Sequence, residues 1–291
     1  MCDENTLKDW ERALKNKPVT RRKFNTLTAG AGLAAALPPL ANAQRISQGP
    51  VTITTPDGIA DGYLAHLPDG AYPGVLLWPD ILGLRPAFLD MARQLAGNGY
   101  TVLVVNPFYR DAPAPVVPSG ASFTDPAVRE IVLPMAQSLN AETHYTDARA
   151  FIDYLDNHEA VSTTRKMGTI GYCMGGPMVM RTAAARPDRI GAAATFHGGG
   201  LVTEAEDSPH LLIPDTSAEF LIAIAENDDM NDPFAKTTLR ESFAEAGIQA
   251  EVEVYEDAQH GWTVPDSVVY NLEQAEKAWS RLQVLFDSAL A

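Results

Sequence analysis

The stretch with the clearest chemical potential is Gly-Tyr-Cys-Met-Gly-Gly at residues 171–176, which places Cys173 between glycines. An apolar run at residues 167–170 precedes it and indicates a buried strand, and residues 177–185 form a plausible helix. A strand, a sharp glycine-flanked turn and a helix lift one side chain out of the turn and leave backbone N–H groups beside it. The pattern therefore predicts that Cys173 is a nucleophile with an oxyanion-binding site next to it.

A thiol attacks as a thiolate, so Cys173 needs a neighbouring base or positive charge. His260 lies just past a predicted strand at residues 251–255, and Asp228 is the first aspartate after the apolar run at residues 220–225. Both follow the carboxyl end of a strand, as Cys173 does, in the chain order nucleophile, acid, histidine. We expect Cys173, His260 and Asp228 to form a catalytic triad in which the aspartate orients the histidine.

Simpler explanations of these residues stay open. Glu226, Asp229 and Asp232 lie beside Asp228 and are alternative acids, although the whole cluster is also compatible with a solvated acidic loop. Unpaired cysteines are usually small buried core residues, so Cys173 also has a purely structural interpretation. No two histidines have the short helical spacing of a metal site, and we predict neither a metal nor a cofactor.

The elements that must position these residues alternate along the chain. Further strands are indicated at residues 51–54, 62–67, 74–78, 101–105 and 190–196, and helices at residues 87–96, 127–139, 141–155 and 233–246. A last helix carries an apolar face that we assign to the core, made of Ala275, Ala278, Trp279, Leu282, Leu285 and Phe286. Such alternation predicts an α/β class, a mostly parallel sheet flanked by helices on both faces. With the turn at Cys173, it predicts an α/β-hydrolase fold in one catalytic domain, residues 44–291.

Residues 1–43 are predicted to be an export signal. Arg21 and Arg22 precede a weakly apolar run at residues 27–40, and Ala-Asn-Ala at residues 41–43 provides a cleavage site. The pattern is typical of a twin-arginine signal, and the run is too short for a bilayer span of about 20 apolar residues. We expect the twin-arginine export machinery as a partner, a periplasmic or secreted product, and no stable membrane insertion after cleavage. An N-terminal anchor helix is the alternative.

Removal of this segment would change the charge and the thiol content of the chain. It holds four of the 37 acidic and seven of the 22 basic residues, so 33 and 15 would remain, a net charge of −18. Such a surface repels nucleic acid, and we expect no nucleic-acid partner. Cys2 would leave with the segment, so Cys173 would be the only thiol and no intramolecular disulfide could form.

Three motifs together resemble the dienelactone hydrolase family: the cysteine turn, Glu-Asn-Asp-Asp at residues 226–229 and Ala-Gln-His-Gly-Trp at residues 258–262. The likeness extends through Pro-Asp-Ile-Leu-Gly at residues 79–83 and Asn-Pro-Phe-Tyr-Arg at residues 106–110. The resemblance implies a single-domain α/β-hydrolase with a Cys-His-Asp triad. It also implies a small-molecule substrate, the lactone ester of dienelactone or a related carboxylic ester.

The resemblance implies further roles, position by position. The backbone N–H groups of Ile81 and Met174 would form the oxyanion hole, and Asp80 would replace a family glutamate that pairs with the resting thiol. Arg110 would hold a substrate carboxylate in a bidentate pair, with Tyr109 beside it in the substrate site.

Two aromatic residues complete the predicted substrate site. His197 follows a strand end and would either donate to a substrate oxygen or serve in packing, and Trp262 follows the catalytic histidine. The family's second carboxylate-binding arginine has no counterpart in Trp-Thr-Val-Pro at residues 262–265. A broad esterase without carboxylate preference is therefore an alternative, and a binding or redox-sensing protein that uses Cys173 is another.

Overall fold

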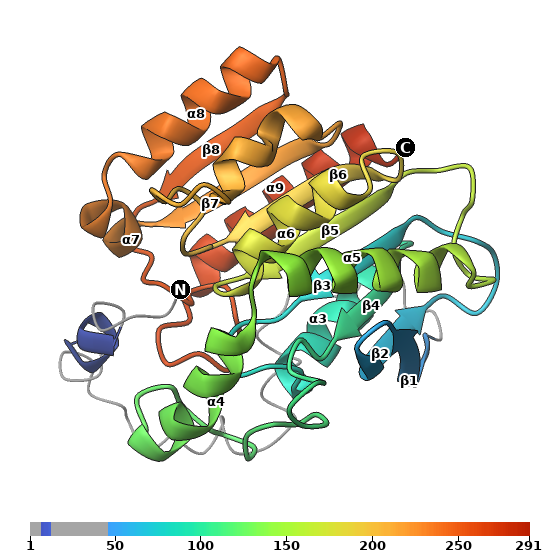
Figure 1. Cartoon of the computed structure of the whole chain (residues 1–291), viewed down its shortest axis with the longest axis horizontal. Helices are drawn as coiled ribbons and strands as arrows, with labels where there is room; N and C mark the ends of the chain where they lie inside the picture. Colours follow the sequence, from blue (N-terminus) through green and yellow to red (C-terminus); the bar gives the residue numbers. More distant parts are fainter. Residues whose placement is uncertain (1–6, 13–45) are drawn as a thin grey trace.

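The computed structural model describes residues 7–12 and 46–291, and its central feature is a sheet of eight strands (Figure 1). The strands are β1 (Ser47–Thr55), β2 (Gly58–His66), β3 (Gly74–Trp78), β4 (Thr101–Val105), β5 (Met167–Tyr172), β6 (Ile190–Phe196), β7 (Glu219–Ala225) and β8 (Ala250–Tyr255). The helices are α3 (Pro86–Gly97), α4 (Pro126–Ser138), α5 (Ala141–Asp156), α6 (Gly175–Ala185), α7 (Glu226–Asn231), α8 (Ala235–Ala246) and α9 (Leu272–Ala289), with a 3₁₀ segment η1 (Pro209–Asp215).

The strand order is β1-β2-β4-β3-β5-β6-β7-β8. The pairs β1–β2 and β2–β4 are antiparallel, whereas β3, β4 and β5 to β8 are all parallel to one another. The carboxyl ends of β3, β5, β7 and β8 therefore meet at one edge of the sheet. This arrangement confirms the predicted α/β-hydrolase fold class.

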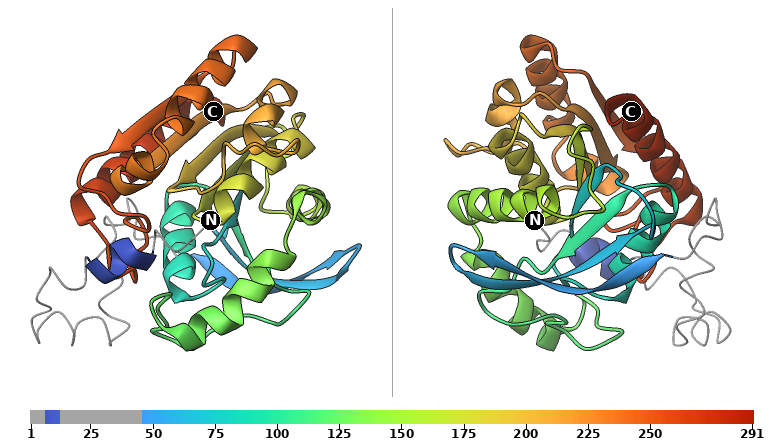
Figure 2. Two further views of the ribbon diagram at one scale, coloured as in Figure 1. Left: turned by 60° about the vertical axis from the view of Figure 1, so that its left-hand side comes forward. Right: turned by 90° about the vertical axis from the view of Figure 1, so that its right-hand side faces the viewer.

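Helices cover both faces of the sheet, as Figure 2 shows. Helices α3 and α9 pack on one face, and α5, α6 and α8 pack on the other. The last helix buries Ala278, Leu282, Leu285 and Phe286, so the apolar face predicted for it lies in the core.

Strands in the middle of the sheet are buried along their whole length because both of their faces are covered. In β6, Ala193 packs on the side of α5 and α6, whereas Ala192 and Ala194 pack on the side of α3 and α9. Successive strand residues point to opposite faces. A strand covered on both faces therefore has few polar residues, and a nearly continuous apolar run in the sequence predicts such a strand.

Residues 7–12 form a short helical segment close to the edge at which the parallel strands end (Figure 2). The predicted twin arginines, apolar run and cleavage site lie outside the described residues. Across the described ranges, 7–12 and 46–291, no helix combines the length and the apolar character that a bilayer crossing requires.

Candidate functional site

Cys173 lies in the tight turn between β5 and α6, in a backbone conformation that few side chains adopt. Its φ is +53°, a left-handed value that costs a residue with a side chain about 1–2 kcal/mol. The surrounding backbone holds it there. The Cys173 N–H donates to the Phe196 carbonyl at 3.0 Å, and the Cys173 carbonyl accepts from the Gly176 N–H at 3.0 Å. The strained turn presents the thiol at the carboxyl edge of the sheet, as the glycine pattern predicted.

The glycines around Cys173 are required by close backbone contacts. A Cβ on Gly171 would lie 2.4 Å from the Gly175 carbonyl oxygen, and a Cβ on Gly175 would lie 2.7 Å from the Trp78 carbonyl oxygen. Both distances are too short for any side chain, so glycine allows α6 to begin directly against β5 and β3.

His260 and Asp228 meet at the ends of two neighbouring strands. His260 follows β8 and is 2% exposed, and its Nδ1 lies 2.8 Å and 3.0 Å from the two carboxylate oxygens of Asp228. The His260 N–H donates to the Asn227 side-chain oxygen at 2.8 Å, which fixes the backbone as well. Asp228 lies in the short helix α7 rather than in an open loop. Among the acids of this cluster, Asp228 is the one that contacts the histidine ring.

Cys173 and Asp228 together control the protonation of His260. Burial is the largest influence on the pKa of His260 and lowers it. Attraction to Asp228 and Cys173, with side-chain hydrogen bonds to both, outweighs burial and raises the pKa to about 10. An imidazolium held between a carboxylate and a sulfur stabilises the thiolate form of that sulfur.

Ile81 and Met174 lie on either side of the turn with N–H groups available. Ile81 is in the turn after β3 and lines the same pocket as Cys173, and Met174 directly precedes α6. Among the described residues, neither backbone N–H has a hydrogen-bond acceptor. Two such donors next to the Cys173 thiol could donate to the negative oxygen of a tetrahedral intermediate.

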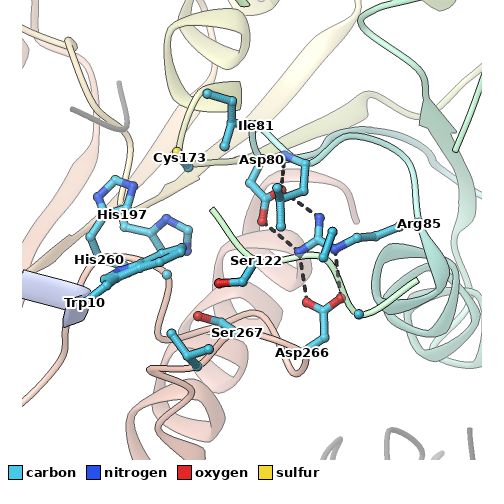
Figure 3. Close-up of a pocket in the computed structure, with 15 residues that line it drawn as sticks. Trp10, Asp80, Ile81, Arg85, Ser122, Cys173, His197, His260, Asp266 and Ser267 are labelled. Carbon is cyan, nitrogen blue, oxygen red and sulfur yellow. Dashed lines mark hydrogen bonds and ion pairs between the residues drawn. The ribbon is translucent and has the colours of Figure 1, made fainter. Parts of the chain in front are cut away.

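Asp80 lines the pocket, but its carboxylate is engaged by an arginine that the sequence analysis did not single out. Arg85 donates to the two oxygens of Asp80 at 2.7 Å and 2.9 Å, and to those of Asp266 at 2.8 Å and 2.9 Å. Burial, the largest influence, raises the pKa of Asp80, although Arg85 opposes that rise. The buried guanidinium of Arg85 thus forms ion pairs with both Asp80 and Asp266 beside Cys173 (Figure 3).

The structure does not bring Arg110 and Tyr109 to this pocket, which corrects the prediction that they bind substrate there. Arg110 donates to Asp147 at 2.7 Å and 2.9 Å and also binds Asp57. The Tyr109 hydroxyl lies 2.8 Å from both Thr55 and Asp147. Asp147 on α5 is 2% exposed, and a buried carboxylate needs a cation and hydrogen bonds. Both side chains therefore turn toward α5 instead of toward Cys173.

His197 lies in the pocket, whereas Trp262 lies behind it. The His197 ring centroid is 5.0 Å from that of His260 and 5.2 Å from that of Trp262. Burial, and secondly repulsion from His260, lowers the pKa of His197 well below its ordinary value, so its ring is neutral. Its Nε2 lies 2.9 Å from the Thr263 hydroxyl. Trp262 is fully buried and supports the two histidines rather than lining the pocket.

The cavity beside Cys173 is small, about 70 Å³, against about 300–1,000 Å³ for a typical ligand site. One of its walls is Trp10, from residues 7–12, which the sequence analysis also missed. The indole Nε1 donates to the carbonyl oxygen of His260 at 2.6 Å, a contact between residues 250 positions apart. No local sequence signal marks a contact at that separation.

Comparisons with known proteins agree with this arrangement. A sequence model of the Dienelactone hydrolase family matches residues 60–290. A carboxymethylenebutenolidase of Rhodococcus opacus is 25% identical over 226 residues, 76% of this chain and 83% of that protein. A Synechocystis protein with the provisional name carboxymethylenebutenolidase is 26% identical over 244 residues, 82% of this chain and 96% of its own. A solved Klebsiella pneumoniae structure, provisionally described as a dienelactone hydrolase, matches the fold with a TM-score of 0.71 at 20% identity, over 84% of this chain and 100% of that one.

Proposed function

Because this chain belongs to the dienelactone hydrolase family, we propose that it cleaves small esters and lactones with Cys173 as the nucleophile. Family membership makes the chain a carboxylic ester or lactone hydrolase, as its motifs predicted. The observation that carries the cysteine proposal is the line of contacts from Asp228 through His260 to Cys173. A redox sensor would need no carboxylate-oriented histidine, so the same contacts favour catalysis over that alternative.

In the first step, the Cys173 sulfur forms a bond to the acyl carbon, and the carbonyl oxygen becomes an oxyanion. The N–H groups of Ile81 and Met174 stabilise this charge, which is absent from the resting ester. The bond from the acyl carbon to the leaving oxygen then breaks, and His260 gives its proton to that oxygen. A thioester on Cys173 and a released alcohol or enol result.

In the second step, water replaces the alcohol. His260, now neutral, accepts a proton from the water whose oxygen attacks the thioester carbon. The bond between carbon and sulfur breaks, and Cys173 returns to the thiolate opposite the imidazolium of His260. Because a thiolate is expelled readily, the thioester forms best from activated esters and lactones, and amide cleavage is not expected.

The charges of the pocket favour neutral substrates over anionic ones. Besides the imidazolium of His260, which Asp228 and Cys173 hold, the pocket is lined by the cation Arg85, and Asp80 and Asp266 already engage Arg85 from two sides. These three side chains carry one positive and two negative charges when all are ionised. A substrate carboxylate would have to displace one of two aspartates from a guanidinium that is 9% exposed. We therefore assign this chain to neutral esters and lactones, rather than to an anionic lactone such as dienelactone.

The test is turnover of a matched panel by the whole chain, its Cys173→Ala variant and its Cys173→Ser variant. The panel pairs aryl esters and lactones with analogues that carry a carboxylate. We expect the Cys173→Ala variant to lose turnover of every ester and wild type to prefer the neutral member of each pair. Undiminished hydrolysis by Cys173→Ala would refute the nucleophile, and a preference for anionic members would refute the charge argument.

We also propose that the twin-arginine machinery exports this chain and that residues 44–291 remain as the periplasmic or secreted enzyme. Arg21, Arg22 and the cleavage pattern at residues 41–43 support the proposal. A variant with Arg21→Lys and Arg22→Lys is expected to stay in the cytoplasm at full length, whereas wild type is found shortened outside it. Recovery of uncut wild type from membranes would favour an anchor instead.

A further inference from the structure

The active site already holds an aromatic side chain from the chain itself. Trp10 is 7% exposed, and its indole N–H donates to the His260 carbonyl oxygen at 2.6 Å. The preceding residue, Asp9, accepts a hydrogen bond from the Asn227 side chain at 2.9 Å. Residues 7–12 thus attach to the two segments that carry His260 and Asp228, and Figure 3 shows Trp10 beside His260.

The surface that receives the indole is shaped for a flat ring. Phe123 meets it edge to face, with centroids 6.3 Å apart and planes at 84°, an arrangement that aromatic pairs prefer. Gly261, at φ +98°, has no side chain there, and a Cβ on it would lie only 3.0 Å from the indole Cζ2. The subsite therefore combines an aromatic edge, a glycine floor and one hydrogen-bond acceptor, the carbonyl of His260.

We propose that this space is an aromatic subsite of the enzyme, which binds a substrate ring bearing an N–H or O–H donor once Trp10 leaves it. The inference rests on the hydrolase function proposed above and specifies its substrate class as esters with an aromatic group. A neutral ring needs no counter-ion from a pocket whose Arg85 is already engaged by Asp80 and Asp266, and the carbonyl of His260 accepts from a donor that a plain phenyl or alkyl ester lacks.

Occupation of the subsite by Trp10 also limits the space in which a substrate can bind beside Cys173. With the indole in place, about 70 Å³ of cavity remains beside Cys173. A substrate must displace the indole or do without the subsite. Loss of residues 1–43 would remove the competitor, so an exported enzyme would gain its aromatic subsite at the moment of cleavage.

The experiment uses the whole chain as wild type, Trp10→Ala, Trp10→Phe and Glu11→Ala, the last an exposed control on the same helical turn. Each protein is alkylated with iodoacetamide, and modification of the Cys173 peptide is followed by mass spectrometry, which separates it from Cys2. We expect Trp10→Ala to be alkylated at least several-fold faster than wild type. Glu11→Ala should match wild type, and Trp10→Phe, which keeps a ring without the donor, should fall between.

The subsite itself is probed by adding 3-methylindole, the free analogue of the missing side chain. We expect it to slow alkylation of Trp10→Ala and to leave wild type and Glu11→Ala unaffected. 1,3-Dimethylindole, which has no N–H, should protect about 3- to 10-fold less well, the usual contribution of one hydrogen bond. Equal protection of wild type and Trp10→Ala, or protection of neither, would overturn the subsite, because the probe would then bind elsewhere or not at all.

Substrate preference gives an independent readout. The ratio of kcat/KM for 4-hydroxyphenyl butyrate, whose ring bears an O–H donor, to that for methyl butyrate is expected to rise in Trp10→Ala relative to wild type, and leaving-group reactivity cancels in this comparison. An unchanged ratio would refute the substrate class. Indole protection without turnover of any ester would instead refute the hydrolase proposal and leave the aromatic subsite standing, so the two failures are distinguishable.

Discussion

The His260→Ala substitution offers the sharpest test of the triad, because it removes the group expected to ionise Cys173. In the intact site, Asp228 and Cys173 raise the pKa of His260 to about 10, so the imidazole keeps its proton through the neutral range. The positive imidazole therefore favours the thiolate form of the Cys173 sulfur that faces it. Without the imidazolium, Cys173 becomes a buried thiol with no such charge beside it.

The expected magnitude follows from the ionised fraction. A thiol with an ordinary pKa of about 8.5 is roughly 0.3% ionised at pH 6, and burial lowers that fraction further. A thiolate of lower pKa is a somewhat weaker nucleophile, with a Brønsted coefficient of about 0.4–0.5. We therefore expect alkylation of Cys173 at pH 6 to be on the order of 100-fold slower in His260→Ala than in wild type.

The assay is the iodoacetamide rate at the Cys173 peptide from pH 5 to pH 9. Wild type should show little dependence on pH, whereas the variant rate should rise about tenfold per pH unit below its thiol pKa. His66→Ala, a histidine change on β2 outside the pocket, should behave as wild type. Rates within threefold of each other at pH 6, with equal slopes, would show that His260 does not ionise Cys173.

Three further predictions concern the framework. Gly175→Ala is expected to lower the free energy of unfolding by about 1–3 kcal/mol, because the new Cβ would lie 2.7 Å from the Trp78 carbonyl. The control in the urea titration is Gly49→Ala, because a Cβ on Gly49 would have no atom within 4 Å. An equal loss of unfolding free energy in both variants would contradict the close contact at Gly175. Arg110→Ala should destabilise the fold by about 3–5 kcal/mol, because it leaves buried Asp147 unpaired, and should not change the ratio of anionic to neutral ester turnover. A change in that ratio would indicate that Arg110 does contact the substrate. The stability that protonated His260 contributes is fully present below pH 6.5, its ordinary pKa, and is lost as pH rises toward about 10. The Tm advantage of wild type over His260→Gln should therefore shrink between pH 7 and pH 10, and a constant or growing advantage in differential scanning fluorimetry would refute the raised pKa.

The positions of the three proposed catalytic residues could be predicted because each depends on local sequence. Cys173 is marked by the glycines that its turn requires, and His260 and Asp228 each follow an apolar strand. Parallel strands bring their carboxyl ends to one edge, so three separate local signals converge on one place. The sheet itself was predictable for a related reason, since strands covered on both faces have few polar residues.

The rest of the site depends on packing that no local pattern records. Arg85 pairs with Asp266, 181 positions away, and Trp10 reaches His260 across 250 positions. Arg110 is a residue that the sequence motif assigned to the substrate site and the structure places elsewhere. Its motif places it correctly after β4, but the direction of its side chain is decided by a buried carboxylate on α5, which only the folded structure reveals.

The double ion pair of Arg85 also bears on how ligands enter and leave. Arg85 lies four residues beyond Ile81, and Asp266 lies six residues beyond His260. The ion pair between buried Arg85 and Asp266 fastens the turn that holds Ile81 to the segment after His260, so outward movement of either wall would leave the buried guanidinium without one of its partners. Two other walls are Trp10, from residues 7–12, and residues 120–122, from a separate loop before α4. Substrate and product are therefore expected to pass along these two walls, while the turn that holds Ile81 and the segment after His260 keep their relative position.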